Sequence, residues 1–227
     1  MQFFIHKDAG SQTITLKEED YHYIFRVRRA QKDSIFKVYN YGDSIYTYVV
    51  VDVKKGLLAL NDKEGIVSKA PSNIHLILAF IDPKDIYELL SFLNEANVTK
   101  LSLFYADFSQ KNRKLNIEKA KKILEFSCMQ CGRFKPLELE LLDDLDEVLK
   151  LYKDAKALHA NAPSLDIKSP SFSLQTPFII GPEGGFSKEE LELLKTRLYS
   201  LNTPFILQAQ NAARYMASLL SQGLFGI

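Results

Sequence analysis

The sequence has no long apolar run, no tryptophan and only two cysteines. Its longest apolar stretch, near Ile74–Ile81, is far shorter than the roughly 20 residues that a helix needs to span a bilayer. The N-terminus reaches charged residues before any apolar stretch develops, so no signal peptide is predicted. We therefore expect a soluble protein of the cytoplasm with no membrane partner.

The two cysteines, Cys128 and Cys131, have the C-x-x-C spacing that is found in zinc sites and redox sites. A zinc site needs about four ligands, and the sequence has no second C-x-x-C and only four scattered histidines. The pair also lies inside a helical pattern, and no strand delivers it to a helix N-terminus, where redox cysteines are activated. The sequence therefore predicts no metal site and no redox site.

Charge of one sign is also scarce, because the formal net charge is only +1. Positive charge is nevertheless concentrated in residues 108–133, which carry seven basic and two acidic side chains, and in Arg26, Arg28, Arg29 and Lys32. Such patches can contact nucleic-acid phosphates even in a nearly neutral chain. Solvated helix faces explain the same pattern, so charge alone does not decide between the two interpretations.

Hydrophobic periodicity changes near residue 72. Before it, short strands such as Ser34–Val38 and Ile45–Val53 predict a small β-barrel. After it, apolar strands alternate with helices, which predicts a parallel sheet covered on both faces. The predicted strands are 73–80, 101–105, 137–141, 155–159, 176–180 and 205–207, and the predicted helices are 83–94, 117–130, 143–152, 188–198 and 211–220.

The segment 181–185 reads Gly-Pro-Glu-Gly-Gly and joins the predicted strand 176–180 to a helix that Ser187 and Glu190 cap as a box. Ligand sites of open α/β sheets lie at the carboxyl ends of strands, and glycines let the backbone approach a ligand closely. The segment lacks the Lys-Ser/Thr ending of a P-loop and the spacing of a dinucleotide fingerprint. By itself it predicts a ligand site at this strand end without naming the ligand.

Four motifs follow one another along the chain, at Tyr21–Arg29, Glu125–Arg133, Ile180–Ser187 with Glu190, and Leu201–Ala212. In this order they resemble the RsmE family of SPOUT-class methyltransferases, which methylate N3 of a uridine in 16S ribosomal RNA. The resemblance implies S-adenosylmethionine as cofactor, 16S ribosomal RNA or the small ribosomal subunit as partner, and a homodimer. It also implies an α/β fold, with a PUA-like RNA-binding barrel at residues 1–70 and a SPOUT domain with a C-terminal trefoil knot at residues 73–227.

The resemblance further implies site residues. Three loops would bind the cofactor, through Leu158, His159, Ile180, Gly181, Glu183, Gly184, Gly185, Leu201, Ile206, Leu207 and Gln208. RNA contacts are expected from Arg26, Arg28, Arg29, Lys111, Arg113, Gln130 and Arg133.

Arg133 and Glu183 are the expected catalytic residues. A cation such as Arg133 over the uracil carbonyls would stabilise the developing negative charge, and Glu183 would act as a base or orient a donor. Each residue has a structural alternative, since an arginine after a helix can serve the helix dipole and loop amides can satisfy a carboxylate. Gln130 would bond either the base or Arg133.

Several positions depart from the family pattern. Phe108 and Gln208 replace customary arginines, and the motif that begins at Phe92 lacks its lysine. Either the RNA contacts have moved to Lys111, Arg113 and Lys114, or activity is weakened. Two alternatives therefore remain, an RNA-binding protein without turnover and a SPOUT enzyme with another RNA target, such as a ribose 2′-hydroxyl.

Overall fold

The computed structural model of the chain describes residues 3–66, 73–166, 175–201 and 203–223. The chain divides into two compact units. The first unit comprises Met1–Lys69 together with Cys128–Lys135, and the second comprises Ala70–Ser127 and Pro136–Ile227.

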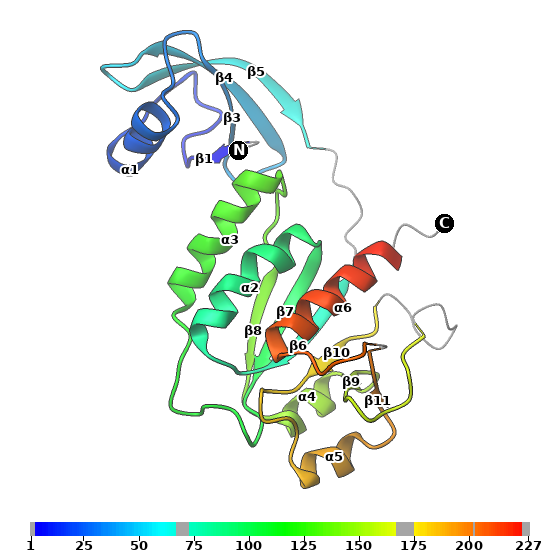
Figure 1. Cartoon of the computed structure of the whole chain (residues 1–227). Helices are drawn as coiled ribbons and strands as arrows, with labels where there is room; N and C mark the ends of the chain where they lie inside the picture. Colours follow the sequence, from blue (N-terminus) through cyan, green and yellow to red (C-terminus); the bar gives the residue numbers. More distant parts are fainter. Residues whose placement is uncertain (1–2, 67–72, 167–174, 202, 224–227) are drawn as a thin grey trace. The chain divides into compact units, whose positions relative to one another are not determined.

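The first unit is built on a curled five-stranded sheet with the strand order β1-β3-β4-β5-β2 (Figure 1). β1 and β3 are parallel, and the other neighbouring strands are antiparallel. This sheet confirms the predicted β-rich N-terminal part. Its elements are β1 (Phe4–Ile5), β2 (Thr13–Thr15), α1 (Glu18–Tyr21), a π-helical segment (His22–Val27), β3 (Ile35–Tyr39), β4 (Ser44–Asp52) and β5 (Leu57–Gly65).

The core of the first unit consists of inward-facing strand residues, of which Val38, Tyr48, Val50 and Leu58 are fully buried. The hydroxyl of Tyr48 donates to the carbonyl of Ser11 at 2.6 Å and accepts from a backbone amide at 2.9 Å. A buried hydroxyl without partners would cost about 1–3 kcal/mol. These two bonds allow the large tyrosine ring to fill the core.

The second unit contains a six-stranded parallel sheet with the order β11-β9-β10-β6-β7-β8 (Figure 1). Every residue of the central strand β6 is buried, as expected where both faces of a strand are covered. The predicted parallel α/β sheet is confirmed. The elements are β6 (Ile74–Ala79), α2 (Pro83–Glu95), β7 (Val98–Phe104), α3 (Ile117–Cys131), β8 (Glu138–Leu142), α4 (Leu145–Leu151), β9 (Lys156–Leu158), β10 (Phe178–Ile180), α5 (Lys188–Leu194), β11 (Leu198–Tyr199) and α6 (Ala209–Gly223).

Two hydrophobic cores cover the two faces of this sheet. On one face α2, α3 and α6 pack against residues that include Leu76 and Leu78 of β6. On the other face α4 and α5 pack against residues that include Ile77 and Ala79. The alternation of β6 between the two cores is the two-residue period of a strand. Within the described ranges, no helix is both long enough and apolar enough to cross a membrane.

The prediction of a last strand at 205–207 is wrong. Leu198 and Tyr199 form that strand as β11, where they pair with Ala157 and Leu158 of β9. The helix predicted over 188–198 ends at Leu194 for the same reason, because the sheet takes up the residues that follow. Residues 205 and 206, although apolar, are 79% and 85% exposed.

Candidate functional site

The glycine loop, Gly181–Gly185, leaves the carboxyl end of β10 directly after the buried Ile180. The amide of Gly185 donates to the carbonyl of Pro182 at 2.9 Å, and Gly185 has a φ of 74°, which favours glycine. A Cβ on Gly181 would lie 3.1 Å from the ring of Phe186. The loop therefore turns tightly, and Glu183 and Gly184 are exposed on it.

The capping box predicted at the start of α5 is confirmed. Ser187 Oγ accepts from the amide of Glu190 at 3.2 Å, and the Glu190 carboxylate accepts from the amide of Ser187 at 2.9 Å. Glu190 is only 5% exposed. Its other oxygen accepts from the amide of Asp107 at 3.0 Å, and Ser187 Oγ donates to the Asp107 carboxylate at 2.6 Å. The loop after β7 is thus bonded to the end of the glycine loop.

Phe108 lies against the glycine loop. A Cβ built on Gly184 would come within 3.1 Å of the Cβ of Phe108. Phe108 sits in a turn where the Ser109 amide donates to the carbonyl of Ala106 at 3.0 Å, and Ser109 Oγ accepts from the Ala106 amide at 3.1 Å. The side chain nevertheless remains 57% exposed.

Leu158 ends β9, and His159 begins the loop that follows it. The His159 amide donates to the carbonyl of Tyr199 in β11 at 2.8 Å, and its Nδ1 accepts from the amide of Asn161 at 3.3 Å. Further along, the amide of Leu165 donates to the carbonyl of Ser200 at 2.8 Å. Backbone bonds therefore hold this loop beside the residues that follow β11.

The segment before α6 contains Leu201, Ile206, Leu207 and Gln208. Leu201 and Leu207 are partly buried against the core, whereas Ile206 and Gln208 are exposed. The Nε2 of Gln210, in the first turn of α6, donates to Oε1 of Gln208 at 3.2 Å. Of the buried side-chain nitrogen and oxygen atoms in the described residues, only Oε1 of Gln210 lacks a hydrogen-bond partner.

The strand order brings the predicted cofactor residues to one edge of the second unit. β9 lies beside β10, and β11 pairs with β9. Because these strands are parallel, the loops that follow them leave the same edge of the sheet. That edge offers loop backbone, the Glu183 carboxylate, the His159 imidazole and the unpaired oxygen of Gln210. In the part of the chain that the structure describes, no three His, Cys, Asp or Glu side chains are grouped to hold a metal ion.

The predicted RNA-binding arginines Arg26, Arg28 and Arg29 of the first unit are exposed. Arg26 lies in the last turn of the π-helical segment, which buries Ile24 and Phe25, and Arg28 and Arg29 follow that segment. The Arg28 amide donates to the carbonyl of Tyr23 at 2.9 Å, so the backbone of this basic turn is fixed. Three exposed guanidinium groups can contact phosphates from this turn.

In the second unit, Lys111 and Arg113 lie in the loop after β7. β7 and β10 are parallel strands of one sheet, so both end at the same edge. Lys111 is exposed. Arg113 pairs with Asp82, the N-cap residue of α2, at 2.8 Å between Nη1 and Oδ2. Lys111 is thus available to an anion, whereas Arg113 also stabilises the start of α2.

Gln130 and Arg133 belong to the first unit, whereas the glycine loop belongs to the second. Gln130 is exposed near the end of α3. Arg133 follows Gly132, and its Nε donates to the carbonyl of Lys135 at 2.7 Å. Burial lowers the pKa of the Arg133 guanidinium, which still remains charged at neutral pH.

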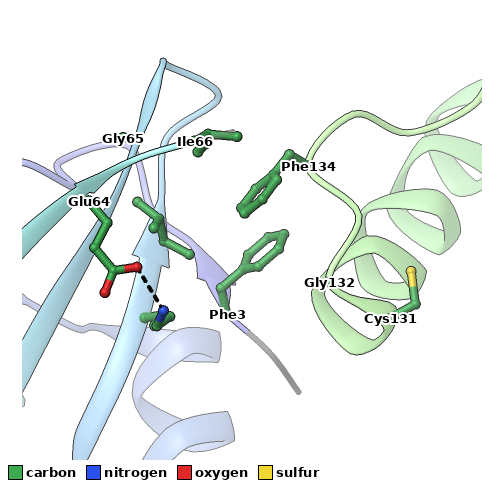
Figure 2. A pocket seen from close by; sticks show the side chains of 9 residues that line it. Phe3, Glu64, Gly65, Ile66, Cys131, Gly132 and Phe134 are labelled. Atoms are coloured by element: carbon green, nitrogen blue, oxygen red, sulfur yellow. Dashed lines mark hydrogen bonds and ion pairs between the residues drawn. The ribbon is translucent and has the colours of Figure 1, made fainter. Parts of the chain in front are cut away.

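Figure 2 shows an open hollow in the first unit. The rings of Phe3 and Phe134 stack there with centroids 5.1 Å apart, and this contact joins the residues after α3 to the sheet. The Lys37–Glu64 ion pair at its side is exposed and of the kind that contributes little stability. None of the predicted cofactor residues lines the hollow, so the sheet edge remains the candidate site.

A partly buried polar network that the sequence did not indicate joins strands β6, β7 and β8 to Tyr152, which follows α4. Its centre is the Glu140 carboxylate, which accepts from Ser102 Oγ at 2.5 Å, from the Tyr152 hydroxyl at 2.6 Å and from Lys100 Nζ at 2.8 Å. Nε2 of His75 lies 2.8 Å from Ser102 Oγ. Because Ser102 donates its proton to Glu140, His75 must be the donor to Ser102, so this is no nucleophile–base pair.

Burial, reinforced by the nearby ammonium of Lys100, lowers the pKa of His75 to about 4. The imidazole is therefore neutral at physiological pH. None of the predicted site residues belongs to this network, and we assign it to the stability of the sheet.

Comparison with known proteins identifies the family of this chain. A family model described as the RNA methyltransferase domain matches residues 68–221, and one described as the RNA methyltransferase PUA domain matches residues 16–61. Two strains of Helicobacter pylori contain proteins named ribosomal RNA small subunit methyltransferase E that are 38% and 37% identical to this chain, over 96% of it and 99% of each relative.

A solved structure of ribosomal RNA small subunit methyltransferase E from Neisseria gonorrhoeae, bound to S-adenosyl methionine, has the same fold. It superposes with a TM-score of 0.76 at 20% identity and covers 98% of this chain and 97% of its own. The resemblance seen in the sequence motifs is thereby confirmed. The chain belongs to the RNA methyltransferase family that includes ribosomal RNA small subunit methyltransferase E.

Proposed function

We propose that this chain transfers the methyl group of S-adenosylmethionine to N3 of a uridine in 16S ribosomal RNA. The observation that carries the proposal is the glycine loop at the carboxyl end of β10, beside the loops that follow β9 and β11. The names of the Helicobacter relatives supply the class of substrate. We expect the protein in the cytoplasm, where ribosomal subunits are assembled.

The residues at this edge fit the cofactor. Oε1 of Gln210 is a buried acceptor without a partner, and a hydroxyl or amino group of a ligand would satisfy it. A Cβ on Gly181 or Gly184 would crowd an aromatic neighbour at 3.1 Å, and we propose that the bare backbone of this loop lies against the ligand. The proposed cofactor residues are Leu158, His159, Ile180, Gly181, Glu183, Gly184, Gly185, Leu201, Ile206, Leu207 and Gln208.

When bound, the cofactor supplies a sulfonium methyl group that is already electrophilic. The chain must then hold the uracil nitrogen in line with that methyl group and favour the loss of the imide proton. A bond would form between N3 and the methyl carbon while the bond from that carbon to the sulfonium sulfur breaks, so that the neutral thioether leaves, and the N3 proton would pass to a base. Glu183 is exposed on the glycine loop and is our candidate for this base.

Arg133 is the candidate for stabilising the negative charge that develops on the uracil carbonyls. It belongs to the first unit, whereas the glycine loop belongs to the second. In a homodimer, the first unit of one subunit can serve the cofactor site of its partner. We therefore propose a homodimer, and the high exposure of Phe205 and Ile206 beside the cofactor loop supports a surface that is covered in the assembly.

RNA contacts are proposed from both units. Arg26, Arg28 and Arg29 form an exposed basic turn in the first unit, and Gln130 lies exposed near the end of α3. In the second unit the exposed Lys111 can contact a phosphate, while Arg113 forms an ion pair with Asp82. The trefoil knot, which would thread the segment before α6, belongs to the same proposal.

The test is transfer of a labelled methyl group to RNA. Purified chain is incubated with S-adenosylmethionine and small subunits from a strain that lacks the gene, and the RNA is digested for nucleoside mass spectrometry. We expect N3-methyluridine to appear. A 2′-O-methyl nucleoside instead would support another RNA target. RNA binding without any methylated product, and no heat in calorimetric titration with the cofactor, would support a binding protein without turnover.

A further inference from the structure

Phe108 is an exposed aromatic side chain that the surrounding structure holds in a fixed place. The preceding residue, Asp107, bonds Ser187 and Glu190 at 2.6 and 3.0 Å. The following residue, Ser109, closes the turn through two bonds to Ala106. Anchors on both sides leave the backbone of Phe108 little freedom, yet its side chain is 57% exposed. A fixed, solvent-facing aromatic ring is pre-organised to contact a ligand.

The place of the ring relative to the glycine loop indicates which ligand it meets. Phe108 contacts Gly184 from the loop after β7, and β7 is separated from β10 by β6. The other proposed cofactor loops follow β9 and β11, which lie on the opposite side of β10. By strand order, the other proposed cofactor loops thus lie on one side of the glycine loop, and Phe108 lies on the other.

The chemistry of the same loop favours RNA. Lys111 and Lys114 follow Phe108 within six residues, and both are exposed. Aromatic rings beside basic side chains are the usual means of binding single-stranded RNA, because the ring stacks on a base and the cations contact phosphates. A cofactor adenine could stack on the same kind of ring, but the strand order puts the other cofactor loops on the far side of the glycine loop.

We propose that Phe108 stacks on a nucleobase of the RNA substrate beside the glycine loop, with Lys111 and Lys114 on the adjoining phosphates. This inference rests on the proposed methyl transfer to RNA and adds the contact that holds the acceptor strand. It makes Phe108 a substrate-contacting residue, while the cofactor is bound by other loops.

The chain contains no tryptophan, so Phe108→Trp introduces a single fluorescent reporter at this position. We expect its emission to be quenched by a ten-nucleotide oligouridine and not by S-adenosylmethionine. Leu151→Trp is the matched control, since Leu151 ends α4 and is 54% exposed. Its emission should respond to neither ligand. Quenching of Phe108→Trp by the cofactor alone would show that the ring meets adenine and would overturn the proposal.

Affinity measurements with small ribosomal subunits give an independent test. Phe108→Ala should weaken RNA binding roughly 5- to 150-fold, the range expected for one lost base stack. Phe108→Tyr should retain binding, whereas Phe108→Leu, which keeps apolar volume without the ring, should lose it. Calorimetric affinity for S-adenosylmethionine should be unchanged in all three. Equal RNA binding by Phe108→Leu and wild type would overturn the proposal.

Size-exclusion chromatography tests whether the exposed ring of Phe108 belongs to a subunit interface. If Phe108→Ala converts a dimer to a monomer, the ring belongs to a subunit interface and the proposal is wrong. Failure of the proposed function would give a different result. Wild-type chain would transfer no methyl group, while oligouridine would still quench the emission of Phe108→Trp. The two failures are therefore separable.

Discussion

The hydroxyl of Ser187 donates a hydrogen bond to the carboxylate of Asp107 at 2.6 Å, across 80 residues of sequence. The same hydroxyl accepts the amide of Glu190 and so begins α5. One side chain therefore starts a helix and attaches the end of the glycine loop to the loop after β7.

Ser187→Ala should lower the free energy of unfolding by about 1 kcal/mol through loss of the helix cap. It should also weaken S-adenosylmethionine binding, because the glycine loop loses its attachment to Asp107. Asp144→Ala is the control, since Asp144 caps α4 by accepting from the amide of Glu147 at 2.9 Å. Urea unfolding should show similar losses for both variants, and calorimetry should show weaker cofactor binding for Ser187→Ala only. Equal cofactor affinities would contradict the link.

Gly185→Ala should destabilise the chain by roughly 1–2 kcal/mol, because an L-residue resists a left-handed φ, which is 74° here. The space around a Cβ at this position is open, so the cost is conformational rather than steric. Gly185→Asn should cost less, because asparagine tolerates this region better. Thermal unfolding of both variants checks the order. If asparagine costs as much as alanine, backbone conformation is not the cause.

Gln210→Leu should have effects of opposite sign on stability and on binding. Removing a buried acceptor without a partner should raise the free energy of unfolding of the ligand-free chain by up to about 1 kcal/mol, because the bond from Nε2 to Gln208 that is lost with it is exposed and weak. If the cofactor satisfies that oxygen, as we propose, its affinity should fall roughly tenfold for one lost hydrogen bond. Gln222→Leu on the exposed part of α6 serves as the control and should leave cofactor binding unchanged. Unaltered cofactor affinity in Gln210→Leu would remove this oxygen from the site.

The chain should lose stability as the pH falls below about 6.5, in part because of His75. Its pKa is about 4 in the folded chain and 6.5 in the unfolded chain, so protons bind the unfolded state first. The contribution of His75 to the free energy of unfolding is fully present above pH 6.5 and is lost between pH 6.5 and pH 4. At pH 5 the loss is about 2 kcal/mol. His75→Gln, which cannot titrate, should show a smaller loss between pH 7 and pH 5 in urea unfolding. An undiminished loss would place the cause in other groups.

Arg28→Ala should weaken binding to RNA of any sequence and reduce the salt dependence of that binding. Each lost phosphate contact lowers the slope of log K against log salt by about 0.7–0.9. Lys55→Ala removes an equally exposed charge from the turn between β4 and β5 and should leave the slope unchanged. Filter binding of small-subunit RNA at several salt concentrations makes the comparison. Identical slopes for Arg28→Ala and wild type would exclude a phosphate contact at this turn.

Local sequence signals were sufficient for the framework of the second unit. The apolar run of β6, the capping box at Ser187 and the glycine loop depend on residues within a few positions of one another, so periodicity and cap chemistry predict them. The bond from Ser187 to Asp107 and the contact of Phe108 with Gly184 join residues far apart in the chain. No spacing rule connects such pairs, and the sequence did not predict them.

The wrong strand at 205–207 shows where propensity fails. Phe205, Ile206 and Leu207 have the composition of a strand, but β-propensity does not say whether a place beside another strand is free. Leu198 and Tyr199 occupy the place beside β9. The sequence also did not predict the unpaired oxygen of Gln210, because burial of one side-chain atom depends on the packing of the whole helix.

The stacking of Phe134 on Phe3 means that the first unit is made of two separate pieces of chain. Cutting the gene after codon 69 would therefore not release an intact module, since the fragment would lack the residues from Cys128 to Lys135 that complete it. Ribosomal synthesis also cannot finish this unit until Phe134 has left the exit tunnel. Over evolutionary time, the N-terminal sheet cannot be exchanged for another as a simple cassette, because any replacement must match the end of α3 as well.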